Sequence, residues 1–462
     1  MKKFLAIFFA KMAMFFSRTL KKGGGTALPG LIAQKIDKDI LSKLVKNLKD
    51  GVVIITGTNG KTTTAKMACD ILANAGLDIV SNQSGSNLSR GLISALIARS
   101  NLTGSTTKGD LAVFEIDEAT MPEAVPMLSP RYIIVTNIFR DQLDRYGEVD
   151  KTAELIGNSL RTAPKDSTVI LNADDPMVAS LASYHENTAF FGLEDSGLKT
   201  ESKLAIDNKD CLLCGAELDF EYRYFGHLGK YKCSSCTFKR PKPENTVYKA
   251  ELNPENSIIS LHTSKKENID LTLSIPGVYN IYNALAATSL SSILGANSEQ
   301  IKYGLENFTA AWGRMEKIQV KDKYIFLLLV KNPTGFNESL RSFINAKEKK
   351  NFLLALNDNF ADGTDISWIW DSELELLKDK ENSIICSGIR AEDMALRLKY
   401  AELDSKNIVI EKDLKKALDI GLSSVSTGET LYIFPTYTAM MEIRNVLVKA
   451  GYTEDFWQPP GA

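Results

Sequence analysis

The stretch from residue 51 to residue 64, Gly-Val-Val-Ile-Ile-Thr-Gly-Thr-Asn-Gly-Lys-Thr-Thr-Thr, constrains the fold of this chain more than any other feature. A run of β-branched residues leads into a glycine turn, and the turn opens onto Lys61 and Thr62. Gly57 and Gly60 let the backbone curl so that successive N–H groups point into one concavity, an arrangement that suits a polyphosphate. The stretch therefore predicts a strand, a phosphate-binding loop and a helix.

The spacing of this loop departs from the usual pattern. A glycine normally stands six residues before the lysine, and Ile55 occupies that position here, so the loop is a variant. We expect Lys61 to reach the β- and γ-phosphates and the Thr62 hydroxyl to ligate Mg²⁺. The alternative is a chance glycine turn in a doubly wound domain.

Strands and helices alternate along much of the chain, which predicts an α/β fold with parallel sheets. The expected strands of the first sheet are Val52–Thr56, Leu111–Ile116, Tyr132–Asn137 and Thr168–Asn172. A second α/β pattern, Rossmann-like, begins after residue 313. We therefore divide the chain into a basic amphipathic segment (1–45), a central ATP-binding domain (46–313, with an insertion at about 200–245) and a C-terminal α/β domain (314–462).

Four of the six cysteines form two Cys-x-x-Cys pairs that are separated by 18 residues: Cys211, Cys214, Cys233 and Cys236. Two such pairs suit a tetrahedral Cys₄ zinc site, and four sulfur ligands leave no open position, so the zinc is expected to be structural. Disulfides are the alternative, which a reducing cytoplasm disfavours. Aromatic and basic residues around the cysteines leave a nucleic-acid-binding zinc ribbon as another possible interpretation. The whole chain, with 55 basic and 57 acidic residues, has no excess of positive charge that would indicate nucleic-acid binding.

The N-terminus resembles a signal peptide only superficially. Lys11 interrupts the apolar run, no cleavage site is convincing, and no stretch reaches the ~18 apolar residues that span a bilayer. We expect a basic amphipathic helix that either packs on the core alone or also touches an anionic membrane surface. The expected location is the cytoplasm, with peripheral contact at the inner membrane face as the second possibility.

Polar motifs follow several of the predicted strands. They are Phe114-Glu-Ile-Asp-Glu-Ala119, Thr136-Asn-Ile-Phe-Arg-Asp-Gln-Leu-Asp-Arg-Tyr-Gly147, Asn172-Ala-Asp-Asp-Pro176, Pro276-Gly-Val-Tyr-Asn-Ile-Tyr-Asn-Ala-Leu285 and Gly313-Arg314. In this order the set resembles the Mur ligase family, ATP-dependent enzymes that join amine nucleophiles to carboxylates. The resemblance covers most of the chain and is most specific in the central domain.

The resemblance implies roles for individual residues. The ATP loop of the family maps onto Gly57, Thr58, Asn59, Gly60, Lys61, Thr62 and Thr63. The Mg²⁺-binding glutamate maps onto Glu115, and the adenine-contacting asparagine maps onto Asn283. Arg314 corresponds to the arginine at the domain exit, and Asn172 and Asp175 stand where the family has nucleotide-side residues.

Three departures from the family pattern concern the acceptor site. Gln142 replaces the usual histidine, and the helix expected at 153–160 lacks the lysine that is carbamylated to hold a second Mg²⁺. The third-domain motif of the family reads Leu328-Leu-Val-Lys-Asn-Pro333. We therefore do not expect the usual two-metal site or a pocket for a free amino acid.

A carboxylate-rich loop, Asn357–Asp371, follows a predicted strand of the third domain. Together with the ribbon and the variant core, it is similar to the branch of the family that amidates the α-carboxylate of D-glutamate in the lipid II stem peptide. That resemblance implies a heterodimer with a GatD-like glutaminase, whose cysteine–histidine pair an aspartate of this loop completes. Asp358 is the first candidate and Asp362 the second; a plain surface loop is the alternative.

The chemistry that follows is ATP-dependent formation of an acyl phosphate, which ammonia then displaces. This chain lacks its own ammonia source, because no histidine lies beyond His262 to serve Cys386. Two other functions stay open at this point: an amino-acid ligase of the Mur or folylpolyglutamate type, and a zinc-ribbon nucleic-acid-binding protein with a nucleotide switch.

Overall fold

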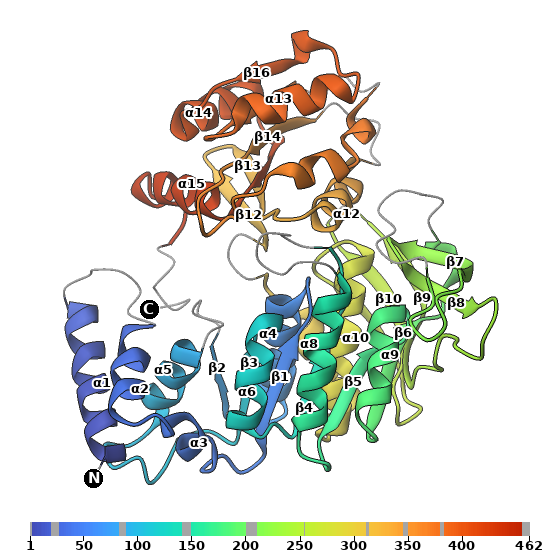
Figure 1. Ribbon diagram of the computed structural model, residues 1–462. Helices are drawn as coiled ribbons and strands as arrows, with labels where there is room; N and C mark the ends of the chain where they lie inside the picture. Colours follow the sequence, from blue (N-terminus) through green and yellow to red (C-terminus); the bar gives the residue numbers. More distant parts are fainter. Residues whose placement is uncertain are drawn as a thin grey trace. The chain divides into compact units, whose positions relative to one another are not determined.

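The computed structural model describes residues 2–19, 27–82, 89–140, 149–199, 210–253, 255–310, 314–344, 350–378 and 383–454 (Figure 1). The chain divides into two compact units. The first contains nearly all of the chain up to Phe308, and the second consists mainly of the chain from Thr309 to the C-terminus, together with two short earlier segments.

The first unit is built on a nine-stranded sheet in the order β11-β10-β9-β6-β5-β4-β1-β3-β2. Its strands are β1 (Gly51–Thr56), β2 (Ile79–Ser81), β3 (Leu111–Glu115), β4 (Tyr132–Val135), β5 (Thr168–Asn172), β6 (Thr188–Leu193), β9 (Asn245–Leu252), β10 (Ser257–His262) and β11 (Asn268–Leu273). The strands from β2 to β9 are parallel, and β10 and β11 continue the sheet in antiparallel pairing. Because the strand order reverses beside β1, the carboxyl ends of β1, β3 and β4 form the crevice where such sheets bind ligands.

Helices cover both faces of this sheet (Figure 1). They are α1 (Lys2–Thr19), α2 (Leu28–Ile36), α3 (Ile40–Val45), α4 (Lys61–Asn74), α5 (Ser89–Arg99), α6 (Met121–Leu128), α8 (Val149–Thr162), α9 (Pro176–Ser180), α10 (Val278–Ile293) and α11 (Ser298–Glu306). Coverage on both faces explains why the central strands read as continuous apolar runs rather than alternating ones. The N-terminal helices share this core, since Ala6, Ile7 and Ala10 of α1 are fully buried in the same cluster as Phe114 of β3.

The insertion after β6 carries an antiparallel hairpin of β7 (Leu218–Phe225) and β8 (Leu228–Cys233). Residues 200–209, which begin the predicted insertion, lie outside the described residues. In a small apolar cluster, Leu218 and Tyr231 of the hairpin pack beside Cys211, Cys233 and Ala179 of α9.

The second unit is a six-stranded sheet in the order β12-β13-β17-β14-β15-β16, in which only β12 is antiparallel to its neighbour. Its strands are β12 (Arg314–Val320), β13 (Lys323–Leu328), β14 (Asn351–Ala355), β15 (Ser383–Ser387), β16 (Ile408–Ile410) and β17 (Thr430–Pro435). Its helices are α12 (Pro333–Ile344), α13 (Ala391–Tyr400), α14 (Leu414–Ser424) and α15 (Tyr437–Lys449). Two separate apolar clusters occupy the two faces of the sheet, as the predicted Rossmann-like fold requires.

The predicted fold class is confirmed in both units. Strand β5 begins and ends where the sequence predicts, and β3 is one residue shorter than predicted. The sequence did not predict β12, because its Arg-Met-Glu-Lys-Ile-Gln-Val pattern is largely polar.

Candidate functional site

The phosphate-loop candidate joins β1 to α4, and its two glycines have specific reasons to be glycine. Gly57 has φ +122° and Gly60 has φ +84°, a region that L side chains rarely adopt. A Cβ on Gly60 would lie 2.1 Å from Oδ1 of Asn283, and one on Gly57 would lie 2.4 Å from Oγ1 of Thr136. Backbone conformation and close packing therefore both exclude a side chain at these two positions.

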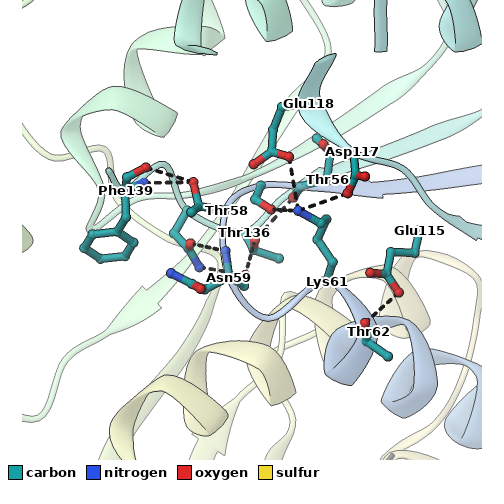
Figure 2. Close-up of polar contacts among 12 residues, drawn as sticks. Thr56, Thr58, Asn59, Lys61, Thr62, Glu115, Asp117, Glu118, Thr136 and Phe139 are labelled. Carbon is teal, nitrogen blue, oxygen red and sulfur yellow. Dashed lines mark hydrogen bonds and ion pairs between the residues drawn. The ribbon is translucent and has the colours of Figure 1, made fainter. Parts of the chain in front are cut away.

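Lys61 lies at the first position of α4 and is almost fully buried. Its Nζ donates to the carbonyl oxygen of Gly57 at 2.6 Å and to Oε2 of Glu118 at 3.1 Å, and it lies 3.6 Å from Oδ1 of Asp117 (Figure 2). The two carboxylates stand just after β3 and hold the ammonium group beside the loop. The sequence marked this segment as acidic but did not assign Asp117 and Glu118 a role.

Thr62 and Glu115 are brought together as the sequence predicts. The Thr62 hydroxyl donates to Oε2 of Glu115 at 2.7 Å (Figure 2). Asn82 fixes the main chain of Glu115 from both sides, because its side chain accepts from Glu115 N at 3.0 Å and donates to Glu115 O at 2.9 Å. A hydroxyl and a carboxylate are hard oxygen ligands, so this pair fits a Mg²⁺ ion that takes its other ligands from water and phosphate.

The back of the loop is held by the segment that follows β4. The Thr136 hydroxyl donates to Asn59 O at 2.8 Å, and Asn59 N donates to Oδ1 of Asn137 at 2.9 Å. The Phe139 N–H donates to Oγ1 of Thr58 at 3.0 Å (Figure 2). Thr136, Asn137 and Phe139 lie within a motif that the sequence singled out, although no loop contact was predicted for them.

Three residues predicted near the nucleotide are buried behind the loop. Asn172 donates to Thr136 O at 3.0 Å, and Asp175 accepts from Ile138 N at 2.8 Å. Asn283 accepts from the Thr64 hydroxyl at 3.3 Å and packs against Gly60. In this structure all three brace the loop, and contact of Asn283 with adenine stays a prediction.

Apart from the cysteines and the two aspartates, the structure describes the remaining predicted residues less completely. Thr63 lies in the first turn of α4. The Arg314 side chain and Gln142 both lie outside the described residues. Lys151 lies in the first turn of α8 and is exposed, and α8 carries no other lysine.

The four ribbon cysteines converge on one point. Their Sγ atoms all lie within 4.8 Å of one another, with Cys211 and Cys236 at 3.6 Å and Cys214 and Cys233 at 3.5 Å. Such separations are far longer than a disulfide bond and are close to the sulfur spacing around a tetrahedral zinc ion with Zn–S bonds of ~2.3 Å. Hydrogen bonding from the Ser235 N–H lowers the pKa of the Cys233 thiol to about 6, whereas burial and hydrogen bonds with the other cysteines raise the pKa of the Cys236 thiol to about 12.

The two candidate aspartates of the second unit have different surroundings. Asp362 is buried and accepts from the Thr438 N–H at 2.7 Å, the Thr438 hydroxyl at 2.6 Å and the Asn359 N–H at 3.1 Å. Asp358 is partly exposed and pairs with Arg390, whose Nε lies 2.7 Å from its Oδ2, and this carboxylate raises the pKa of Arg390. Phe360 between them is 85% exposed. Asp358 is therefore the better placed to meet another chain, whereas Asp362 shapes the loop.

Known proteins resemble both units. The Mur ligase middle domain model matches residues 55–227, and the MurT ligase C-terminal model matches residues 329–440. The lipid II isoglutaminyl synthase (glutamine-hydrolyzing) subunit MurT of Staphylococcus aureus (strain COL) is 37% identical, over 90% of this chain and 92% of the relative. The subunit of the same name from Streptococcus pneumoniae (strain ATCC BAA-255 / R6) is 35% identical, over 92% of this chain and 93% of the relative.

Solved structures share the fold at lower identity. A pseudomurein peptide ligase type C from Methanothermus fervidus is 26% identical, with a TM-score of 0.68 over 89% of this chain and 80% of that one. The MurF ligase of Thermotoga maritima, solved in complex with ADP, is 15% identical, with a TM-score of 0.63 over 90% of this chain and 84% of that one. At 15% identity the MurF likeness concerns the fold alone.

Proposed function

The chain belongs to the family of MurT subunits of lipid II isoglutaminyl synthase, a branch of the Mur ligases, and on this premise we propose its reaction in detail. The protein is a carbon–nitrogen ligase that converts the α-carboxylate of D-glutamate in the lipid II stem peptide into the amide of D-isoglutamine. Its energy source is ATP with Mg²⁺, and its nitrogen is ammonia from a glutaminase subunit. The observation that carries the proposal is the built loop in which Lys61, Thr62 and Glu115 lie together.

The proposed reaction has two steps. The substrate carboxylate attacks the γ-phosphate of ATP, which gives an acyl phosphate and ADP. Ammonia then adds to the acyl carbon, the bond to the phosphate oxygen breaks, and the departing phosphate takes up the proton that the nitrogen loses, which leaves the amide. Lys61 and the loop N–H groups would stabilise the charge on the phosphoryl oxygens, and Thr62 with Glu115 would hold Mg²⁺.

Asp358 is proposed to act on the partner rather than on lipid II. An aspartate that accepts from a catalytic histidine fixes its tautomer and favours the imidazolium. Asp358 already pairs with the Arg390 cation, so exchange for a partner histidine conserves the charge balance at its carboxylate. The exposed Phe360 ring beside it offers apolar surface for the same contact.

The amino-acid ligase is the second candidate function. It would consume ATP in the presence of a free amino acid and without a glutaminase. An assay that supplies lipid II, ATP and Mg²⁺ with ammonium, and in parallel with D-glutamate or L-alanine, separates the two functions. We expect product only with ammonium, and an amino-acid adduct would establish the ligase instead.

We propose a structural zinc ion at the four ribbon cysteines. Cys214→Ser should reduce bound zinc from one equivalent to less than half and lower the melting temperature. Cys69→Ser is the matched control, because Cys69 lies on α4 of the first unit and not in the ribbon. Equal zinc contents in the two variants would contradict the assignment.

We also propose that α1 contacts an anionic membrane surface from the cytoplasmic side. The helix buries Ala6, Ile7 and Ala10 but leaves a contiguous apolar stripe exposed. The stripe consists of Phe4, Leu5, Phe8, Phe9, Met12, Phe15 and Phe16. The first 36 residues contain seven lysines and arginines and no acidic residue, which suits an anionic surface. No helix among the described residues is long and apolar enough to cross a membrane.

Vesicle sedimentation tests this contact. The chain should bind vesicles that contain phosphatidylglycerol more strongly than vesicles of phosphatidylcholine alone, and added salt should weaken the binding. The double substitution Phe9→Ser with Phe16→Ser should lower the bound fraction severalfold. The control Tyr303→Ser removes an equally exposed aromatic ring from α11, so equal losses in both variants would contradict the assignment.

A further inference from the structure

The turn of the zinc-ribbon hairpin is buried against the back of the phosphate loop rather than exposed to solvent. Gly226 and His227 form the two-residue turn between β7 and β8. A polar hairpin turn normally faces water, yet the His227 side chain is fully buried. Phe225, the last residue of β7, is only 3% exposed. The turn therefore serves as an internal contact of the first unit.

The hairpin turn packs against the ring of Phe139. The Phe139 ring stacks on Phe225 with centroids 5.6 Å apart and lies 4.5 Å from the His227 ring. The backbone of Phe139, on its other side, exchanges hydrogen bonds with the Thr58 hydroxyl at 3.0 and 3.2 Å (Figure 2). Phe139 thus joins the hairpin turn directly to a residue of the phosphate loop.

A second set of contacts leads to the same loop. Nε2 of His227 lies 3.3 Å from Oδ1 of Asp175, whose other oxygen holds the Ile138 N–H next to Phe139. The Phe225 ring also packs on Tyr282 of α10, with centroids 5.7 Å apart. Tyr282 precedes Asn283, which lies against Gly60. The hairpin turn therefore supports the loop through both the segment after β4 and helix α10.

The base of the hairpin carries the metal ligands, whereas a buried ion pair lies beside its turn, where the Gly229 N–H donates to the backbone oxygen of Asp174 at 2.8 Å. Cys233 ends β8 and pairs in register with Leu218 at the start of β7. Arg240, which follows the ribbon, binds the fully buried Asp174, and Tyr282 donates to the same carboxylate at 2.7 Å. One end of the hairpin is therefore fixed by the cysteines, and the other is inserted behind the loop.

We propose that Phe225 and His227 are positioning residues for the nucleotide: the zinc-ribbon hairpin holds Phe139, and through it Thr58, in the conformation that binds phosphate. The ribbon, in this view, is a brace for the ATP site as well as an independently closed metal site. The inference rests on the proposed function only in taking the Gly57–Thr62 loop as the nucleotide site.

The test compares one substitution at the two ends of the same hairpin. Phe225→Leu removes the ring that stacks on Phe139 and keeps an apolar side chain. Phe220→Leu is the matched control, because Phe220 packs on Tyr231 near the cysteines. His227→Ala is the stronger variant of the turn. For each protein, ADP affinity is measured by calorimetry, zinc by stoichiometry, and loop opening by hydrogen exchange of residues 57–62.

We expect Phe225→Leu to weaken ADP binding about threefold and His227→Ala about tenfold, with one zinc retained and faster exchange at residues 57–62. Phe220→Leu should bind ADP like the wild type. The inference is overturned if Phe225→Leu binds ADP as tightly as the wild type, or loses no more affinity than Phe220→Leu. Because Phe225→Leu is a mild change, it decides the matter even if His227→Ala fails to fold. A wild-type chain that bound no ADP would instead refute the nucleotide site itself.

Discussion

The phosphate loop of the first unit and the carboxylate-rich loop of the second unit both follow a buried parallel strand, yet they are built differently. Around the phosphate loop, Lys61, Glu115 and Glu118 are each at most 7% exposed, and each of them has a hydrogen-bond partner. In the carboxylate-rich loop, Asp358 is partly exposed and Phe360 is 85% exposed.

We propose that this difference separates a site that one chain completes from a surface that binds a second chain. Buried charges need partners in place, which the first unit provides for Lys61 with two carboxylates and a carbonyl. A surface that binds a partner is exposed in the isolated chain, which agrees with the exposed Phe360 ring and the partly exposed Asp358 carboxylate. Variants of the phosphate loop should therefore slow amidation from both glutamine and ammonium, whereas variants of the carboxylate-rich loop should slow amidation from glutamine alone.

The largest effect is expected from Lys61→Ala. Removal of the ammonium group should slow ATP-dependent amidation about a thousandfold, whether glutamine or ammonium supplies the nitrogen, because both routes share the acyl phosphate. Initial rates of ADP release measure the effect. Lys66→Ala, on the same helix, is the control and should stay near the wild type, since Lys66 pairs with Asp70. Retained turnover in Lys61→Ala would remove the phosphate-loop assignment.

Asp358→Asn should slow amidation from glutamine but not amidation from ammonium. We expect glutamine-dependent amidation in the complex with the glutaminase to fall about a hundredfold, because an amide cannot favour the imidazolium of a partner histidine, while ammonium-dependent amidation is unchanged. Asp393→Asn, which alters another carboxylate near Arg390, should leave both rates unchanged. An equal fall of both amidation rates would assign Asp358 to the synthetase site, and the two loops would then not differ in function as proposed.

The smallest effect concerns the packing of the phosphate loop. Gly60 and Gly76 have similar positive φ angles, +84° and +92°, but a Cβ on Gly76 would meet nothing within 4 Å. Gly76→Ala should cost about 1 kcal/mol of unfolding free energy from backbone strain alone. Gly60→Ala should cost about 1–3 kcal/mol more, because Asn283 must shift. Urea denaturation measures the difference, and equal losses of unfolding free energy in the two variants would show that the loop accommodates a Cβ at position 60.

The sequence predicted the phosphate loop well because its signal is local. The glycines, Lys61 and the β-branched strand lie within fourteen residues, and each has a distinct physical role. The approach of Glu115 to Thr62 was also predictable, because the carboxyl ends of neighbouring parallel strands meet at one edge of the sheet. Its role as a Mg²⁺ ligand stays a prediction. That Glu118 rather than Glu115 would pair with Lys61 depends on the turn after β3, which residue types alone do not determine.

The contacts of the ribbon were less predictable. Cysteine spacing predicted the cluster at the base of the hairpin, but a histidine in a polar turn is normally exposed, and nothing near His227 in the sequence indicates that Phe139 covers it. Asn172 and Asp175 were predicted beside the nucleotide from resemblance, and their complete burial follows from hydrogen bonds to segments distant in the sequence.

We propose that this chain forms the amide itself and receives ammonia from a separate glutaminase. The most direct measurement incubates the chain, with and without the glutaminase subunit, with lipid II, ATP, Mg²⁺ and either glutamine or ammonium, and examines the stem peptide by mass spectrometry. We expect amidated glutamate with ammonium in the complex, and with glutamine only when the glutaminase is present. Amidation from glutamine by this chain alone, or addition of a free amino acid in place of the amide, would contradict it.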